Sequence, residues 1–84
     1  EASIHLYPNP VNGNIVYVRF DQPLVTEMVY KLVDQRGVTI DTGILSPGRK
    51  MYEFDTSWLH NGMNYLMLGN DNAGYAVKKM IVLR

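Results

Sequence analysis

Apolar and polar residues alternate with a period of two along most of this chain, which constrains the fold more than any other feature of the sequence. Within residues 14–20, the apolar Val16, Val18 and Phe20 fall on one side and Arg19 falls on the other. Because successive side chains of a β-strand point to opposite faces, this pattern predicts a strand with one buried face. No stretch of about ten or more residues has the apolar spacing of an amphipathic helix.

Short segments rich in glycine, proline and asparagine divide the alternation into separate runs. Glycine supplies a positive φ and proline lacks the backbone donor, so strands are expected to end there. The runs predict strands around residues 5–7 and at 14–20, 28–34, 38–41, 51–55, 64–68 and 75–83. About seven short strands predict an all-β fold, a small antiparallel, immunoglobulin-like β-sandwich. We expect run 64–68 to be covered on both sides, and the core to hold the aromatic residues Tyr30, Tyr52, Phe54 and Tyr65.

Length and composition limit the classes of protein that this chain can represent. A chain of 84 residues supports one small core, so we expect a single domain over residues 1–84. Because the chain starts with Glu1 rather than methionine, we expect this domain to be a fragment of a larger secreted parent. Eight basic residues balance eight acidic ones, which argues against a nucleic-acid partner. The chain has no cysteine for disulfides or thiol chemistry, and no apolar run long enough to span a membrane.

Residues able to carry out chemistry are present but scattered. His5 and His60 stand alone, without the third ligand that a metal site needs. The acidic residues alternate with apolar ones or end strands, as on a solvated face; they include Asp34, Asp41, Glu53 and Asp55. No nucleophile-elbow sequence surrounds Ser57. The sequence therefore predicts no enzyme, no cofactor and no metal.

Two further features allow more than one interpretation. The loop at residues 70–74 holds oxygen ligands beside a glycine, as calcium sites do, but it lacks the EF-hand spacing, and a hairpin turn is favoured. Tyr17 and Trp58 are the aromatic residues expected on the surface. They support an alternative function, an immunoglobulin-like carbohydrate-binding or adhesion module of a secreted protein.

The last part of the chain is basic. After Asp71 there is no acidic residue, and the three charged residues are Lys78, Lys79 and Arg84. Lysines protect an edge strand from unwanted pairing, and a basic strand can also be offered to a partner. An edge strand also carries the hazard that two copies of the isolated domain pair through it as a dimer.

Three separated motifs occur in a fixed order along the chain. They are Leu6–Pro10, which contains Pro-Asn-Pro, then Asp55–Gly62 followed by an aromatic strand through Tyr65, and finally Lys78–Arg84. This order resembles the type A C-terminal sorting domain of the type IX secretion system, also called the Por secretion system C-terminal targeting domain. The family is found on exported proteins of Bacteroidetes. The resemblance covers residues 4–84, including a strand–Asp–x–x–Gly turn at Val33–Gly37.

The resemblance implies a secretion signal. The parent would transit the periplasm, be recognised by the outer-membrane translocon, and reach the cell surface or the medium. A sortase-like peptidase would cut the parent from this domain and attach or release it. The residues that the resemblance assigns to translocon recognition are Pro8, Asn9, Pro10, Gly62, Tyr65, Lys78, Lys79, Met80, Ile81, Val82, Leu83 and Arg84.

Two structural expectations follow from these motifs. We hypothesise that the strand at residues 75–83 lies near a sheet edge, where a partner reads its backbone and the charges of Lys78 and Lys79 by β-augmentation. The family pattern Gly-x-Tyr has one extra residue here, between Gly62 and Tyr65. This insertion predicts either a bulge where the strand begins or an aromatic residue displaced by one position.

Overall fold

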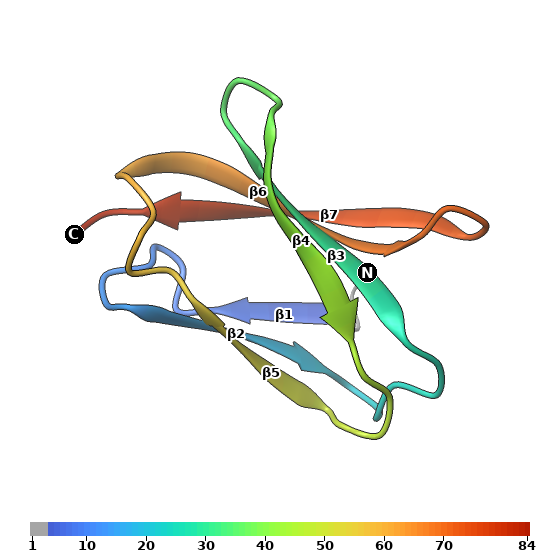
Figure 1. The fold of residues 1–84 in the computed structure, drawn as a ribbon. Helices are drawn as coiled ribbons and strands as arrows, with labels where there is room; N and C mark the ends of the chain where they lie inside the picture. The colour runs from blue at the N-terminus through green and yellow to red at the C-terminus, as the bar shows by residue number, and fades with distance from the viewer. Residues whose placement is uncertain (1–3) are drawn as a thin grey trace.

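The computed structural model describes residues 4–84, which form two antiparallel sheets stacked as a sandwich (Figure 1). The strands are β1 (Ile4–Tyr7), β2 (Ile15–Phe20), β3 (Met28–Asp34), β4 (Thr39–Leu45), β5 (Met51–Asp55), β6 (Gly62–Asn70) and β7 (Gly74–Val82). One sheet has the order β1-β2-β5 and the other the order β4-β3-β6-β7. The predicted all-β sandwich is confirmed, and each predicted run contributes a strand.

The chain crosses between the two sheets after β2, β4 and β5. These crossings place strands that are distant in sequence side by side, with β2 next to β5 and β3 next to β6. The order agrees with an immunoglobulin-like arrangement, in which the first, second and fifth strands share one sheet. The immunoglobulin-like assignment itself stays a prediction.

The core lies between the sheets and is built from alternate residues of the strands. The predicted buried face of β2 is confirmed, with Val16, Val18 and Phe20 all buried. The opposite sheet contributes apolar side chains that pack in the same two clusters, namely Leu32, Leu45, Leu66, Leu68, Met80 and Val82. Two of the predicted core aromatics, Tyr30 and Phe54, pack edge to face with ring centroids 4.9 Å apart.

The prediction for β6 is wrong in two respects. Asn64, Leu66 and Leu68 are buried, whereas the residues between them are half-buried. Tyr65 therefore faces away from the core, and no layer of residues 4–84 covers that side of the strand. The register of β6 with β7 runs without interruption from Gly62 opposite Val82 to Asn70 opposite Gly74, so the predicted bulge is also wrong. A displaced aromatic residue remains as the interpretation of the extra residue.

The turns follow from side chains that bond the nearby backbone. In the β3–β4 turn, one carboxylate oxygen of Asp34 accepts the amide hydrogens of Arg36 and Val38, and Gly37 adopts a φ of 85°. Loop 70–74 is the hairpin turn that we favoured, in which Asn70 Oδ1 accepts the amide hydrogen of Ala73. These turns fix the ends of the sheet that carries the candidate site.

Candidate functional site

Strand β7 is the outermost strand of the four-stranded sheet, as the sequence predicted. Its outer backbone groups are, however, already paired in part. The side-chain amide of Asn9 donates to the carbonyl oxygen of Lys79 at 2.9 Å and accepts the amide hydrogen of Ile81 at 3.0 Å. Asn9 lies between two prolines, each preceded by a cis peptide bond. Its side chain thus pairs with the strand as a backbone peptide group would.

Val11 continues this pairing toward the end of the chain. Its amide nitrogen donates to Ile81 at 2.6 Å, and its carbonyl accepts from Leu83 at 2.9 Å, which forms a parallel bridge with Val82. The Val11 side chain is 0% exposed and belongs to the core. The segment Pro8–Val11 therefore covers the edge of β7 from Lys79 to Leu83.

A second asparagine binds the chain just beyond β7. Asn61 Oδ1 accepts the amide hydrogen of Arg84 at 3.0 Å, and Asn61 Nδ2 donates to the Arg84 carbonyl at 3.2 Å. The Arg84 guanidinium donates to the carbonyls of Gly13 at 2.9 Å and Thr56 at 2.8 Å, and also to that of Leu59. We call Asn9, Val11, Asn61 and Arg84 the C-terminal clasp, because together they join all three sequence motifs.

The predicted recognition residues separate into groups with different surroundings. Met80 and Val82 are buried in the core, and Gly62 pairs with Val82 across the sheet. Pro8 and Pro10 are exposed beside the clasp. Lys78 alternates with Lys79 and lies on the side of the strand that bears Met80, half-buried. By contrast, the outward positions of the sheet bring together Tyr65, Lys79 and Ile81.

These outward residues belong to a wider surface, which we call the outer face of the four-stranded sheet. Its central strands contribute apolar side chains next to those of β4 and β7: Val29, Val33, Ile44, Met63, Met67 and Val77. Ile44 is 57% exposed and Val77 is 55% exposed. The ammonium group of Lys31 lies 4.8 Å from the ring centre of Tyr75. Among residues 4–84, Lys31 and Lys79 are the charged strand residues of this face, and the Asp71 carboxylate lies at its margin, where it accepts a hydrogen bond from the Tyr75 hydroxyl at 3.1 Å.

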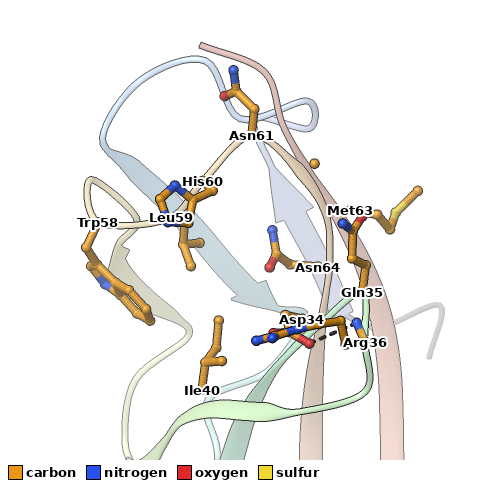
Figure 2. Close-up of a pocket in the computed structure, with 11 residues that line it drawn as sticks. Asp34, Gln35, Arg36, Ile40, Trp58, Leu59, His60, Asn61, Met63 and Asn64 are labelled. Atoms are coloured by element: carbon orange, nitrogen blue, oxygen red, sulfur yellow. Dashed lines mark hydrogen bonds and ion pairs between the residues drawn. The ribbon is translucent and has the colours of Figure 1, made fainter.

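A hollow of about 450 Å³ opens at the end of the sandwich that carries the β3–β4 turn (Figure 2). Trp58 forms part of its wall and is 49% exposed, which confirms its predicted surface position. The Trp58 indole donates to the Asp55 carbonyl at 2.9 Å, and residues 56–59 form a turn. Opposite lies the Arg36 guanidinium, whose bond to Asp34 lowers the pKa of that carboxyl group.

The other sequence-predicted chemistry stays dispersed in space. In the part of the chain that the structure describes, no group of three or more His, Asp or Glu side chains is placed to hold a metal ion. His5 bonds Asp21 at 2.9 Å, whereas His60 lies at the hollow. Tyr17 is half-buried and stacks on Tyr7, with ring centroids 5.7 Å apart. No helix within residues 4–84 is long and apolar enough to cross a membrane.

The sequence reasoning missed the residues that hold β7 in place. It placed Asn61 only within the motif Asp55–Gly62 and gave no role to Val11. The sequence did contain a local signal for Asn61, because it lies in the motif Asp55–Gly62 and its side-chain amide can both donate and accept a hydrogen bond. The pairing with Arg84 spans 23 residues, and nothing in the spacing indicates it.

The fold and the clasp define a small β-sandwich module with an exposed outer sheet face and a hollow at one end. A family model described as the secretion system C-terminal sorting domain matches residues 5–83. The chain belongs to this family, the C-terminal sorting domains of the type IX secretion system. Searches of curated proteins and of solved structures gave no match. A sorting domain of this system marks a protein for export across the outer membrane, and the family is not a catalytic one.

Proposed function

We propose that this domain carries a larger parent protein through the periplasm to the outer-membrane translocon of the type IX system. A sortase-like peptidase then cleaves the parent from the domain and attaches it to the cell surface or releases it. Membership of the sorting-domain family over residues 5–83 is the observation that carries this proposal. The domain itself acts as a ligand of the machinery and uses no cofactor or metal.

The outer face of the four-stranded sheet is the surface that we propose for recognition. It is largely apolar, its strands bear the two lysines Lys31 and Lys79, and it contains three of the predicted residues: Tyr65, Lys79 and Ile81. Large exposed apolar surfaces on small proteins mark interaction sites. The translocon surface that meets this face would be apolar with acidic side chains at its margin, because opposite charges steer association.

Recognition through side chains replaces the simple β-augmentation that the sequence suggested for the end of β7. The edge from Lys79 to Leu83 is paired with Asn9 and Val11, so an added strand would have to displace that segment. We assign Pro8, Pro10 and Gly62, together with the buried Met80 and Val82, to positioning the strand. The half of β7 that carries Tyr75 and Val77 has no strand neighbour on its outer side among residues 4–84. Pairing of two isolated copies is expected there or along β4.

Export of a fused reporter tests the proposal. A reporter with an inner-membrane export signal and this domain at its end should reach the medium or the surface in a host with the translocon. Without the translocon it should stay in the periplasm. Retention of the fusion between the membranes of the competent host would contradict the proposed function.

Matched substitutions test the proposed surface. Tyr65→Thr and Lys79→Glu should reduce the exported fraction several-fold, because they alter the outer face. Tyr17→Thr is the control, since Tyr17 is also a half-buried tyrosine but lies on the other sheet. The melting temperature of each purified domain separates lost recognition from lost folding. Equal export of all three variants would exclude the outer face as the recognition surface.

One observation favours the alternative carbohydrate-binding or adhesion function. Tyr7 and Tyr17 stack at an interplanar angle of 30° on the outer side of the three-stranded sheet, where Tyr7 is exposed. Such a pair offers ring faces on which a sugar can pack. Saturable glycan binding by the isolated domain that Tyr17→Thr abolishes would support this function.

A further inference from the structure

Among residues 4–84, two buried polar side chains have no hydrogen-bond partner: the hydroxyl of Thr56, which is fully buried, and the amide of Asn64, which lines the hollow. Asn64 occupies an inward position of β6 next to the buried Leu66 and is only 6% exposed. No hydrogen bond joins its side-chain amide to another group among residues 4–84, although Asn64 lines the hollow at the end of the sandwich. The Asn64 amide reaches the open hollow and is therefore available to hydrogen-bond an occupant of that hollow.

The walls of the hollow define what that occupant can be. Figure 2 shows Trp58 and Ile40 at one side and the Asp34–Arg36 pair at another, with the amide of Asn64 directed toward the space between them. Trp58 is held in place by its bond to the Asp55 carbonyl, so its half-exposed ring forms a fixed apolar wall. A volume of about 450 Å³ lies within the range of ligand pockets.

The same chain shows how its asparagines bind a ligand of this kind. Asn9 and Asn61 each donate to a carbonyl and accept an amide hydrogen from the extended backbone at or beyond the end of β7. Asn64 has the same donor and acceptor, and neither is paired within residues 4–84. We propose that the hollow binds an extended peptide segment, with Asn64 pairing to one peptide unit and an apolar side chain seated between Trp58 and Ile40.

This peptide site lies apart from the outer face that we propose for the translocon, and it does not depend on that function. Asn64 alternates with the outward Tyr65 and points to the opposite side of β6. Peptide binding and export of a reporter are therefore separate measurements, and a domain that fails to bind the peptide can still be exported. A sugar packed on Trp58 is the other ligand class that such walls accommodate, and the experiment below distinguishes it.

Titrations followed by nuclear magnetic resonance test the site with defined probes. N-acetyl-leucine N-methylamide supplies one donor, one acceptor and one apolar side chain. At about 10 mM, which exceeds a millimolar Kd tenfold, it should shift the amide signals of residues 34–36 and 58–64. The N,N-dimethylamide analogue lacks the donor and should bind at least threefold more weakly. Methyl glucoside and methyl mannoside, the sugar probes, should leave the signals unchanged.

Two variants assign the binding to named residues. Asn64→Ala should weaken binding of the peptide probe about tenfold or more, whereas Asn12→Ala, in an exposed loop, should not change it. The pair of leucine amides provides the same test on the unaltered domain if Asn64→Ala fails to fold. The proposal is overturned if the peptide probe causes no shifts, if the two amides bind equally, or if only the glycosides bind.

Discussion

Replacing Asn9 by aspartate tests whether the clasp holds β7 through one side-chain amide. The aspartate keeps an oxygen for the Ile81 amide hydrogen but loses the donor to the Lys79 carbonyl, and it places a carboxylate oxygen beside that carbonyl. A hydrogen bond contributes about 0.5–1.5 kcal/mol net, and exposed partners recover water, so the lost bond costs about 1 kcal/mol. In a domain of this size, that loss lowers Tm by about 4–8 °C.

The pH dependence of this variant gives the sharper test. An aspartic acid can donate a hydrogen bond whereas an aspartate cannot, so the folded state favours the protonated form and raises the pKa of the introduced group. The penalty is therefore present at neutral pH and fades as pH falls toward the unfolded value of about 3.9. Asn9→Ala removes both bonds and should show a loss of about 1–2 kcal/mol without this recovery.

Thermal unfolding followed by circular dichroism at neutral and acidic pH measures both effects. Asn12→Asp serves as the control, because Asn12 is an exposed asparagine of the same loop region. Each variant is compared with the unaltered domain at the same pH, which removes the acid response of all other groups. Equal melting of Asn9→Asp and Asn12→Asp at neutral pH would refute the role of the amide. So would a penalty that persists unchanged after protonation.

Three further substitutions probe other parts of the fold. Arg84→Met removes the guanidinium bonds to three carbonyls and should lower the free energy of unfolding by about 2 kcal/mol in urea titrations, since charged donors form the stronger bonds. Arg36 lowers the pKa of the Asp34 carboxyl group in the folded state, so the carboxylate stabilises the fold above its unfolded pKa of about 3.9. This stabilisation is lost as pH falls through the lowered pKa of the folded state. Asp34→Asn should therefore lose less stability than the unaltered domain when melting curves are recorded at acidic pH. Gly69→Ala would place a Cβ 2.1 Å from a backbone oxygen and should cost about 1–3 kcal/mol, whereas Gly13→Ala meets no atom within 4 Å and should be neutral or slightly stabilising by calorimetry.

The strands were predictable because their signal is local. Val16, Val18 and Phe20 stand two apart with a charge between them, and that phase leaves one choice of buried face. In β6 both phases are largely apolar, so the pattern could not tell which side faces the core. Asn64 took the inward position and Tyr65 the outward one, against the usual preference for burying the aromatic residue.

The clasp was not predictable from the sequence because its bonds join distant parts of the chain. Asn9 and Lys79 are 70 residues apart, and Arg84 and Gly13 are 71 apart. A side-chain amide that pairs with a strand edge leaves no periodicity, whereas alternation repeats along every strand. The family resemblance identified the three motifs by their order along the chain, whereas the fold shows that they are in contact.

Because of the clasp, deleting Val82–Arg84 would not by itself test whether the translocon recognises the end of β7. Removing these residues would abolish the bridge to Val11 and the bonds of Arg84 to three carbonyls, so the domain would lose stability together with its last residues. A reporter fused to this truncated domain is expected to lose export whenever export requires a folded domain, whether or not the last residues are recognised. Ile81→Thr is the better test, because it alters a half-buried outward side chain and retains the backbone bonds to Asn9 and Val11. Reduced export with a nearly unchanged melting temperature would assign recognition to the outer face, and full export would leave the end of β7 with a structural role alone.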